Sequence, residues 1–110
     1  MVREYIQNSV GADERAVAAA LRPILESFMR VAYPQWFPPG TLLGPFVALC
    51  EQREGTQDQI LTPADRAELR ALLDYANLFH HDTNAAWQTV IINDQELLNF
   101  AQRTVVFSRR

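Results

Sequence analysis

Apolar residues recur at steps of three and four along most of this chain, the spacing that places them on one face of an α-helix. The longest such run extends from Glu14 to about Tyr33. Pro23 lies inside it, and we expect a kink there because the proline ring removes a backbone donor and crowds the preceding turn. The predicted apolar face of this helix consists of Val17, Ala20, Leu21, Ile24, Leu25, Phe28 and Val31 or Ala32.

Three further helices are predicted downstream. One begins near Thr41 and ends near Arg53, before Gly55. The next begins at Thr62-Pro63, where threonine is a good cap and proline suits the first turn, and its apolar face runs to Phe79. The last opens at Asn93 and runs to about Phe107.

A short helix is also possible within residues 1–11. Short loops between helices of similar length favour an antiparallel bundle. We therefore predict an all-α fold, a single domain over residues 1–110 built as a helical bundle of about four main helices.

Composition narrows the classes of function. The formal net charge of −3 argues against bulk electrostatic binding of nucleic acid, although it leaves a local basic site open. All ten cationic side chains are arginine, which suits two-donor contacts to phosphate but is also the bias of a GC-rich genome. No apolar run is long enough for a membrane span and the N-terminus lacks the apolar core of a signal peptide, so we expect a cytoplasmic protein without membrane contacts. The single cysteine, Cys50, lies in an apolar run and is expected to be a buried thiol.

Two pairs of polar residues have the four-residue spacing that places side chains on one helix face. Arg22 and Glu26 form the first pair, within the apolar stretch of the long helix, and Asn77 and His81 form the second. If these two helices pack side by side, all four side chains could converge. The alternatives are an ordinary surface ion pair for Arg22 and Glu26, and a capping role for the histidines at the negative end of a helix.

A convergence of these four residues would suit RNA cleavage. Histidine can transfer a proton near neutral pH, arginine can neutralise charge that develops on a phosphorane, and glutamate can orient a neighbour or act as a base. RNA carries its own 2′-hydroxyl nucleophile, so no cofactor is expected. No metal site is expected either, because the adjacent His80 and His81 would point about 100° apart on a helix and no further ligands are spaced to complete a site.

The segments Leu21-Arg22-Pro23-Ile24-Leu25-Glu26-Ser27-Phe28 and Tyr75-Ala76-Asn77-Leu78-Phe79-His80-His81-Asp82-Thr83-Asn84 carry a family resemblance. They resemble the C-terminal region of bacterial AAA/ABC-type ATPases related to the RloC and PrrC anticodon nucleases, whose nuclease half is similar to the HEPN helical-bundle ribonucleases. The family's Arg-x-x-x-Glu and Asn-x-x-x-His motifs fall on Arg22 with Glu26 and on Asn77 with His81. The resemblance covers roughly residues 15–110. One departure is that the window before His81 holds no arginine, whereas the common HEPN motif has one there.

The resemblance implies a HEPN-like bundle that is a metal-independent RNA endonuclease, with tRNA anticodon loops as substrate and a translation-blocking role in antiviral defence. It implies Arg22, Glu26, Asn77 and His81 as the catalytic residues, and a homodimer. It also implies an ATPase domain or subunit that this chain lacks, since it has neither a phosphate-binding loop nor any lysine. We therefore expect the chain to be the C-terminal part of a longer protein or a subunit of a complex. The alternative is a non-catalytic helical interaction or dimerisation module attached to an ATPase, with the Trp36–Phe37 connector and the Trp87 region as its candidate surfaces.

Overall fold

The chain folds as an all-α bundle, as predicted. A computed structural model describes residues 1–7, 13–80 and 83–109. Within these ranges the helices are α1 (Val2–Gln7), α2 (Glu14–Ala32), α3 (Leu43–Arg53), α4 (Pro63–Asn77) and α5 (Asp94–Phe107). The possible short helix near the N-terminus is present as α1, and α2, α3 and α5 lie within two residues of their predicted ends. Helix α4 ends at Asn77, so the expectation that it continues to the histidines and carries Asn77 and His81 on one face was wrong.

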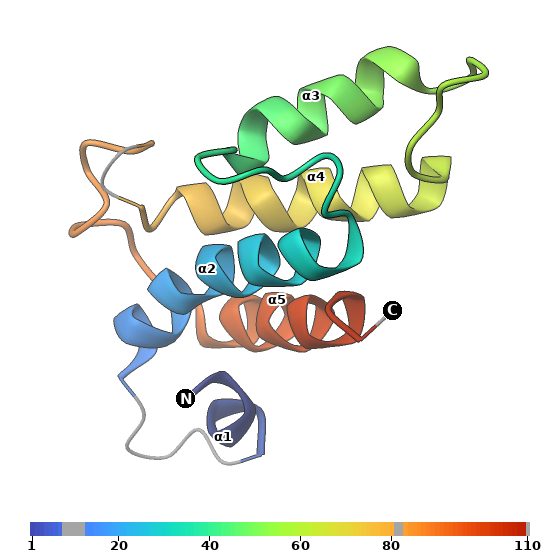
Figure 1. Cartoon of the computed structure of the whole chain (residues 1–110). Helices are drawn as coiled ribbons and strands as arrows, with labels where there is room; N and C mark the ends of the chain where they lie inside the picture. Colours follow the sequence, from blue (N-terminus) through green and yellow to red (C-terminus); the bar gives the residue numbers. More distant parts are fainter. Residues whose placement is uncertain (8–12, 81–82, 110) are drawn as a thin grey trace.

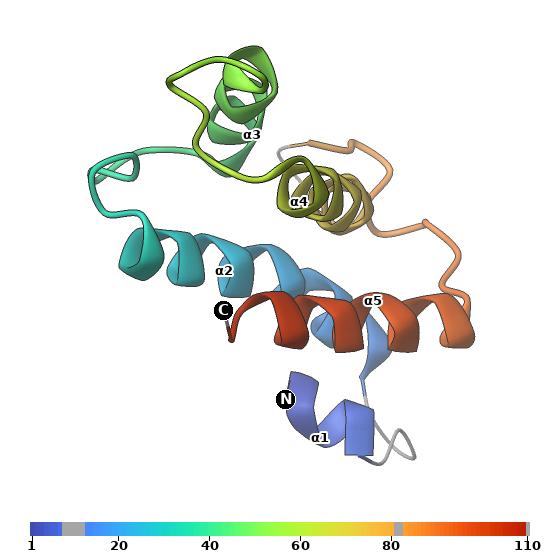
Figure 2. The same ribbon diagram turned by 90° about the vertical axis from the view of Figure 1, so that its right-hand side faces the viewer.

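The helices stack in tiers (Figures 1 and 2). Helices α2 and α5 lie side by side, α1 packs against both of them on one side, and α4 packs against both on the other. Helix α3 lies beyond α4 and packs against it. This arrangement places the middle of α2 next to the C-terminal part of α4, where the candidate site residues are found.

Side-chain caps explain where three of the helices begin. The side chain of Asp13 accepts from the amide of Ala16 at the start of α2. At the start of α4, Oγ1 of Thr62 accepts from the amide of Asp65 over 3.1 Å. At the start of α5, Oδ1 of Asn93 accepts from the amide of Glu96 over 3.0 Å. Each cap satisfies an amide that the first turn of a helix leaves without an intrahelical partner. The predicted starts at Thr62 and Asn93 are thereby confirmed.

The buried face of α2 differs from the predicted one. Its most buried side chains are Val17, Ala18, Leu21, Arg22, Leu25 and Met29. Val31 is 83% exposed and Ala32 is also exposed, so their predicted place in the core was wrong. The reason is that α2 packs against α4 as well as α5, which rotates its buried face toward Arg22 and leaves Ile24 and Phe28 only partly covered. Helix α2 continues through Pro23, and the kink expected there remains a prediction.

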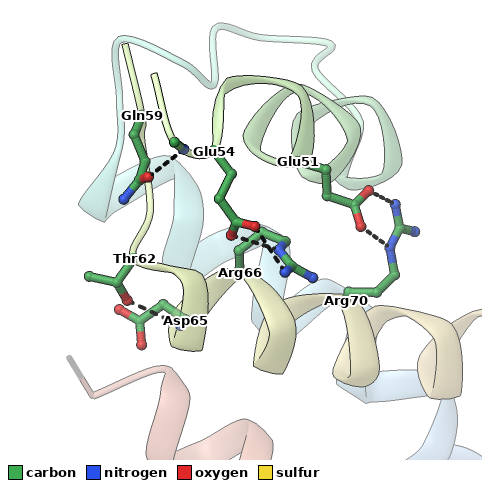
Figure 3. A network of polar contacts seen from close by, with 8 residues as sticks. Glu51, Glu54, Gln59, Thr62, Asp65, Arg66 and Arg70 are labelled. Atoms are coloured by element: carbon green, nitrogen blue, oxygen red, sulfur yellow. Dashed lines mark hydrogen bonds and ion pairs between the residues drawn. The ribbon is translucent and has the colours of Figure 1, made fainter. Parts of the chain in front are cut away.

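Helix α3 is held to α4 by apolar contacts and by ion pairs. Phe46, Val47 and Cys50 of α3 belong to one core cluster with Leu69 and Leu73 of α4. Figure 3 shows the polar side of this contact, where the guanidinium of Arg66 donates two hydrogen bonds to Glu54 and that of Arg70 contacts Glu51.

The thiol of Cys50 is buried, as predicted, and burial raises its pKa to about 11.

Phe37 is buried too, and the guanidinium of Arg53 lies 4.8 Å from the ring centre of Trp36. The two aromatic side chains of the Trp36–Phe37 connector therefore already pack against other residues of the chain. None of the described helices combines the length and apolar character that a membrane span requires.

Candidate active site

Arg22 of α2 and Asn77 of α4 are in direct contact. The Nη1 atom of Arg22 donates a hydrogen bond to Oδ1 of Asn77 over 2.9 Å, across 55 positions of sequence. Asn77 is the last residue of α4, and Arg22 lies near the middle of α2. The contact arises because the two helices pack together, which brings Asn77 against Arg22.

Glu26 completes a buried polar group on α2. Its Oε1 atom lies 3.5 Å from Nε of Arg22, and the two side chains are only 16% and 8% exposed. The Nε atom of Arg22 makes no hydrogen bond to a described residue, so its contact with Glu26 is electrostatic rather than a well-formed hydrogen bond. Such a pair is less screened by water and salt than a surface pair. The surface-pair alternative therefore does not apply to Arg22 and Glu26.

Arg22 is the only charged residue among the described residues that is classed as buried, with 7% of its surface exposed. A buried guanidinium is costly unless its charge and its donors are matched. Here Asn77 accepts from one nitrogen and Glu26 balances the charge at another. The structure thus brings together three of the four residues that the sequence singled out.

His81 and Asp82 lie outside the described residues, so the position of His81 relative to Arg22 stays a prediction. The residues on either side of them are described. His80 is partly buried, and Oγ1 of Thr83 donates to the backbone carbonyl of Asn77 over 2.7 Å. His80 and Thr83 therefore both lie at the end of α4.

Two further residues position this end of α4, and sequence reasoning missed both. Thr83 is one of them, and Asn84 is the other because its Nδ2 donates to the carbonyl of Leu78 over 2.9 Å. Both satisfy carbonyls that the end of a helix leaves unpaired. The available signal was the run of polar residues after His80, which is typical of such capping.

Arg15 holds the connector between α4 and α5 to α2. Its guanidinium donates to the carbonyls of Trp87 and Val90. Arg15 lies seven residues before Arg22, two helical turns away on a similar side of α2. The two arginines therefore join α2 both to the end of α4 and to the segment that follows it.

A separate group of titratable side chains lies where α1, α2 and α5 meet. Tyr5 of α1 donates from its hydroxyl to the carbonyl of Asp94 over 3.4 Å. The pKa of Glu14 at the start of α2 is raised, mainly by a hydrogen bond with the carboxyl group of Asp94 and to a lesser extent by burial. Within the described ranges, no three His, Cys, Asp or Glu side chains are grouped as a metal ion would require.

Comparisons with protein-family models, with curated proteins and with solved structures find no match to this chain. The anticodon-nuclease resemblance therefore rests on the two short motifs alone, and a functional assignment has to be argued from the contact between Arg22, Glu26 and Asn77.

Proposed function

We propose that this chain is a metal-independent RNA endonuclease domain that cleaves tRNA in the anticodon loop. The observation that supports this most is the hydrogen bond from Arg22 to Asn77, with Glu26 beside it. This contact joins the two motifs that resemble those of the anticodon nucleases.

The proposed reaction uses the RNA's own nucleophile. The 2′-hydroxyl oxygen attacks the adjacent phosphorus, and the bond from phosphorus to the 5′ oxygen of the next nucleotide breaks. The products are a 2′,3′-cyclic phosphate and a 5′-hydroxyl. His81 makes one of the two proton transfers, taking the proton of the 2′-hydroxyl or giving one to the leaving 5′ oxygen, and solvent water makes the other. Arg22 is the cation that stabilises the charge developing on the phosphorane, and Glu26 and Asn77 hold its guanidinium in place.

The proposal requires an arginine at this position, and the geometry supports that requirement. Arg22 uses Nη1 to reach Asn77 and Nε to face Glu26, which lie on different helices. A lysine offers a single nitrogen and cannot serve both partners while also facing a phosphate.

The direct test is to incubate the purified chain with total tRNA and EDTA and to sequence the cleaved ends. We expect cuts in anticodon loops with cyclic phosphate ends, strongly reduced in His81→Ala. His80→Ala is the matched control, because it removes the neighbouring imidazole and should retain cleavage. If folded wild-type protein leaves tRNA intact, or if both histidine variants cleave at the wild-type rate, the proposal is wrong.

The surrounding biology follows from the same resemblance. The domain would act as a translation-blocking toxin in antiviral defence, work as a homodimer, and be controlled by an ATPase domain or subunit outside this chain.

The second candidate function is a non-catalytic helical interaction or dimerisation module. The observation that favours it is the 7% exposure of Arg22, since a buried arginine matched by its own chain can be purely structural. In that case Arg22→Lys would reduce stability, and tRNA would remain intact with every variant.

A further inference from the structure

An apolar groove lies on the outer side of α2, away from the buried Arg22. Its floor is formed by side chains of α2 and by Ser108, which follows α5, and it encloses a shallow hollow of about 640 Å³. A second, smaller hollow shares Ile24 and Ser108 with it. A third hollow shares Arg3, Val105 and Arg109 with the second one, over the C-terminal part of α5 and α1. We call this continuous surface the α2–α5 groove. The residues on its α2 side are Ala20, Pro23, Ile24, Ser27, Phe28 and Val31.

The spacing along α2 fits a second helix. Ala20, Ile24, Ser27 and Val31 follow one another at steps of four, three and four, the pattern of a helix–helix packing seam. Small Ala20 and Ser27 alternate with larger Ile24 and Val31, so side chains of a partner helix have holes to enter. Val31 is 83% exposed, and Val106 at the α5 side of the groove is 55% exposed.

The rim of the groove is positive, although the whole chain is negative. Arg3 and Arg109 line it, and Arg30 lies three residues after Ser27 on the adjoining side of α2. Glu4, the neighbour of Arg3 in the chain, also lines it. Among the described residues that line these hollows, the cationic side chains, Arg3 and Arg109, thus outnumber the single carboxylate, Glu4.

These three arginines differ from the others that the structure describes. None of their three side chains makes a hydrogen bond or an ion pair with a described residue. The other six described arginines each engage a carboxylate, an amide, a backbone carbonyl or an aromatic ring of the chain; they are Arg15, Arg22, Arg53, Arg66, Arg70 and Arg103. The arginines without such partners are thus gathered around one apolar surface.

We propose that the α2–α5 groove binds an amphipathic helix of a partner protein that is apolar on one face and acidic along its flanks. Carboxylates on the flanks would meet the arginine rim while apolar side chains enter the seam. A second copy of this chain fits less well, because two-fold packing would bring the arginine rims of both copies together. An RNA backbone would leave Ile24, Phe28 and Val31 without apolar partners. This proposal does not depend on the nuclease function.

The proposal is tested with the whole chain and three designed helical peptides. One has leucines at seam spacing with glutamates on both flanks, the second has lysines in place of the glutamates, and the third is a scrambled glutamate peptide. Binding is followed by ¹⁵N–¹H NMR shifts of the chain and by titration at low and high salt. The chain variants are Val31→Asp and Arg30→Glu, both at exposed positions, with Ile91→Asp as the matched control because Ile91 is 91% exposed but lies on the connector before α5.

We expect the glutamate peptide alone to bind, to shift resonances of α2 and the end of α5, and to weaken with salt. Val31→Asp and Arg30→Glu should each lower its affinity by about tenfold or more, and Ile91→Asp should leave it unchanged. The proposal is overturned if the glutamate peptide does not bind, if the lysine or scrambled peptide binds as tightly, or if the groove variants bind like the wild type. It is also overturned if the chain self-associates through this face, or if an RNA or an anionic vesicle shifts the groove resonances instead.

Discussion

Two arginine–carboxylate pairs in this chain have the same spacing and the same separation but different surroundings. Arg22 with Glu26 and Arg70 with Asp74 are both four residues apart, and both have nitrogen and oxygen 3.5 Å apart. The first pair is 8% and 16% exposed, and the second is 34% and 63% exposed. Comparing Glu26→Gln with Asp74→Asn therefore contrasts the loss of a largely buried partner with the loss of an exposed one in the free energy of unfolding.

Removing one partner of a fully buried ion pair costs about 3–5 kcal/mol, because it leaves an uncompensated charge. For Glu26→Gln we expect a smaller loss of about 2 kcal/mol, since Glu26 keeps some contact with water and Asn77 still accepts from Arg22. For Asp74→Asn we expect a loss of about 0.2–0.5 kcal/mol, the usual value for an exposed helical pair. Arg70 also retains Glu51 as a partner in that variant.

The measurement is urea unfolding followed by circular dichroism near neutral pH, at low and at molar salt. Salt should remove most of the effect of Asp74→Asn and little of the effect of Glu26→Gln. Equal losses in the two variants, or an effect of Glu26→Gln that disappears in salt, would refute the view that Arg22 and Glu26 form a buried pair.

Three further predictions concern other parts of the chain. Cys50 should react with iodoacetamide much more slowly at mildly alkaline pH in the folded chain than in urea, as mass spectrometry would show, because burial raises its pKa to about 11. Folding raises the pKa of Glu14, so its protonated form contributes stability that is complete below its ordinary pKa and is lost as the pH rises through the raised value. Urea unfolding across this pH range should show that loss of stability in the wild type and not in Asp94→Asn. Pro23→Ala should raise the free energy of unfolding by about 1–3 kcal/mol, because Pro23 is exposed inside a helix and alanine restores a backbone donor without removing core contacts.

Local signals predicted the helices well. Thr62 and Asn93 are side-chain caps whose effect is confined to the next three residues, so the sequence alone locates the starts of α4 and α5. The face that a helix buries depends on all its neighbours, and the buried face predicted for α2 was partly wrong. The apolar pattern of α2 placed Val31 in the core, whereas packing against both α4 and α5 left it exposed.

The candidate site was partly predictable for the same reason. The four-residue spacing of Arg22 and Glu26 places them together whenever α2 forms. Their contact with Asn77 required α2 and α4 to be neighbours, which spacing suggested but did not determine. The roles of Arg15 and Thr83 depend on where the chain turns after α4, and no periodic pattern encodes those turns.

The central claim is that Arg22 is the cation of an RNA-cleaving site. The most direct measurement is the rate of tRNA cleavage in EDTA by Arg22→Lys, with Arg70→Lys as the control for a charge-conserving change at an arginine of α4. We predict that Arg22→Lys, shown to be folded by circular dichroism, loses about 100-fold or more in rate, as when one oxyanion donor is removed, whereas Arg70→Lys cleaves like the wild type. Wild-type cleavage by folded Arg22→Lys, or no cleavage by the folded wild-type chain, would contradict the account.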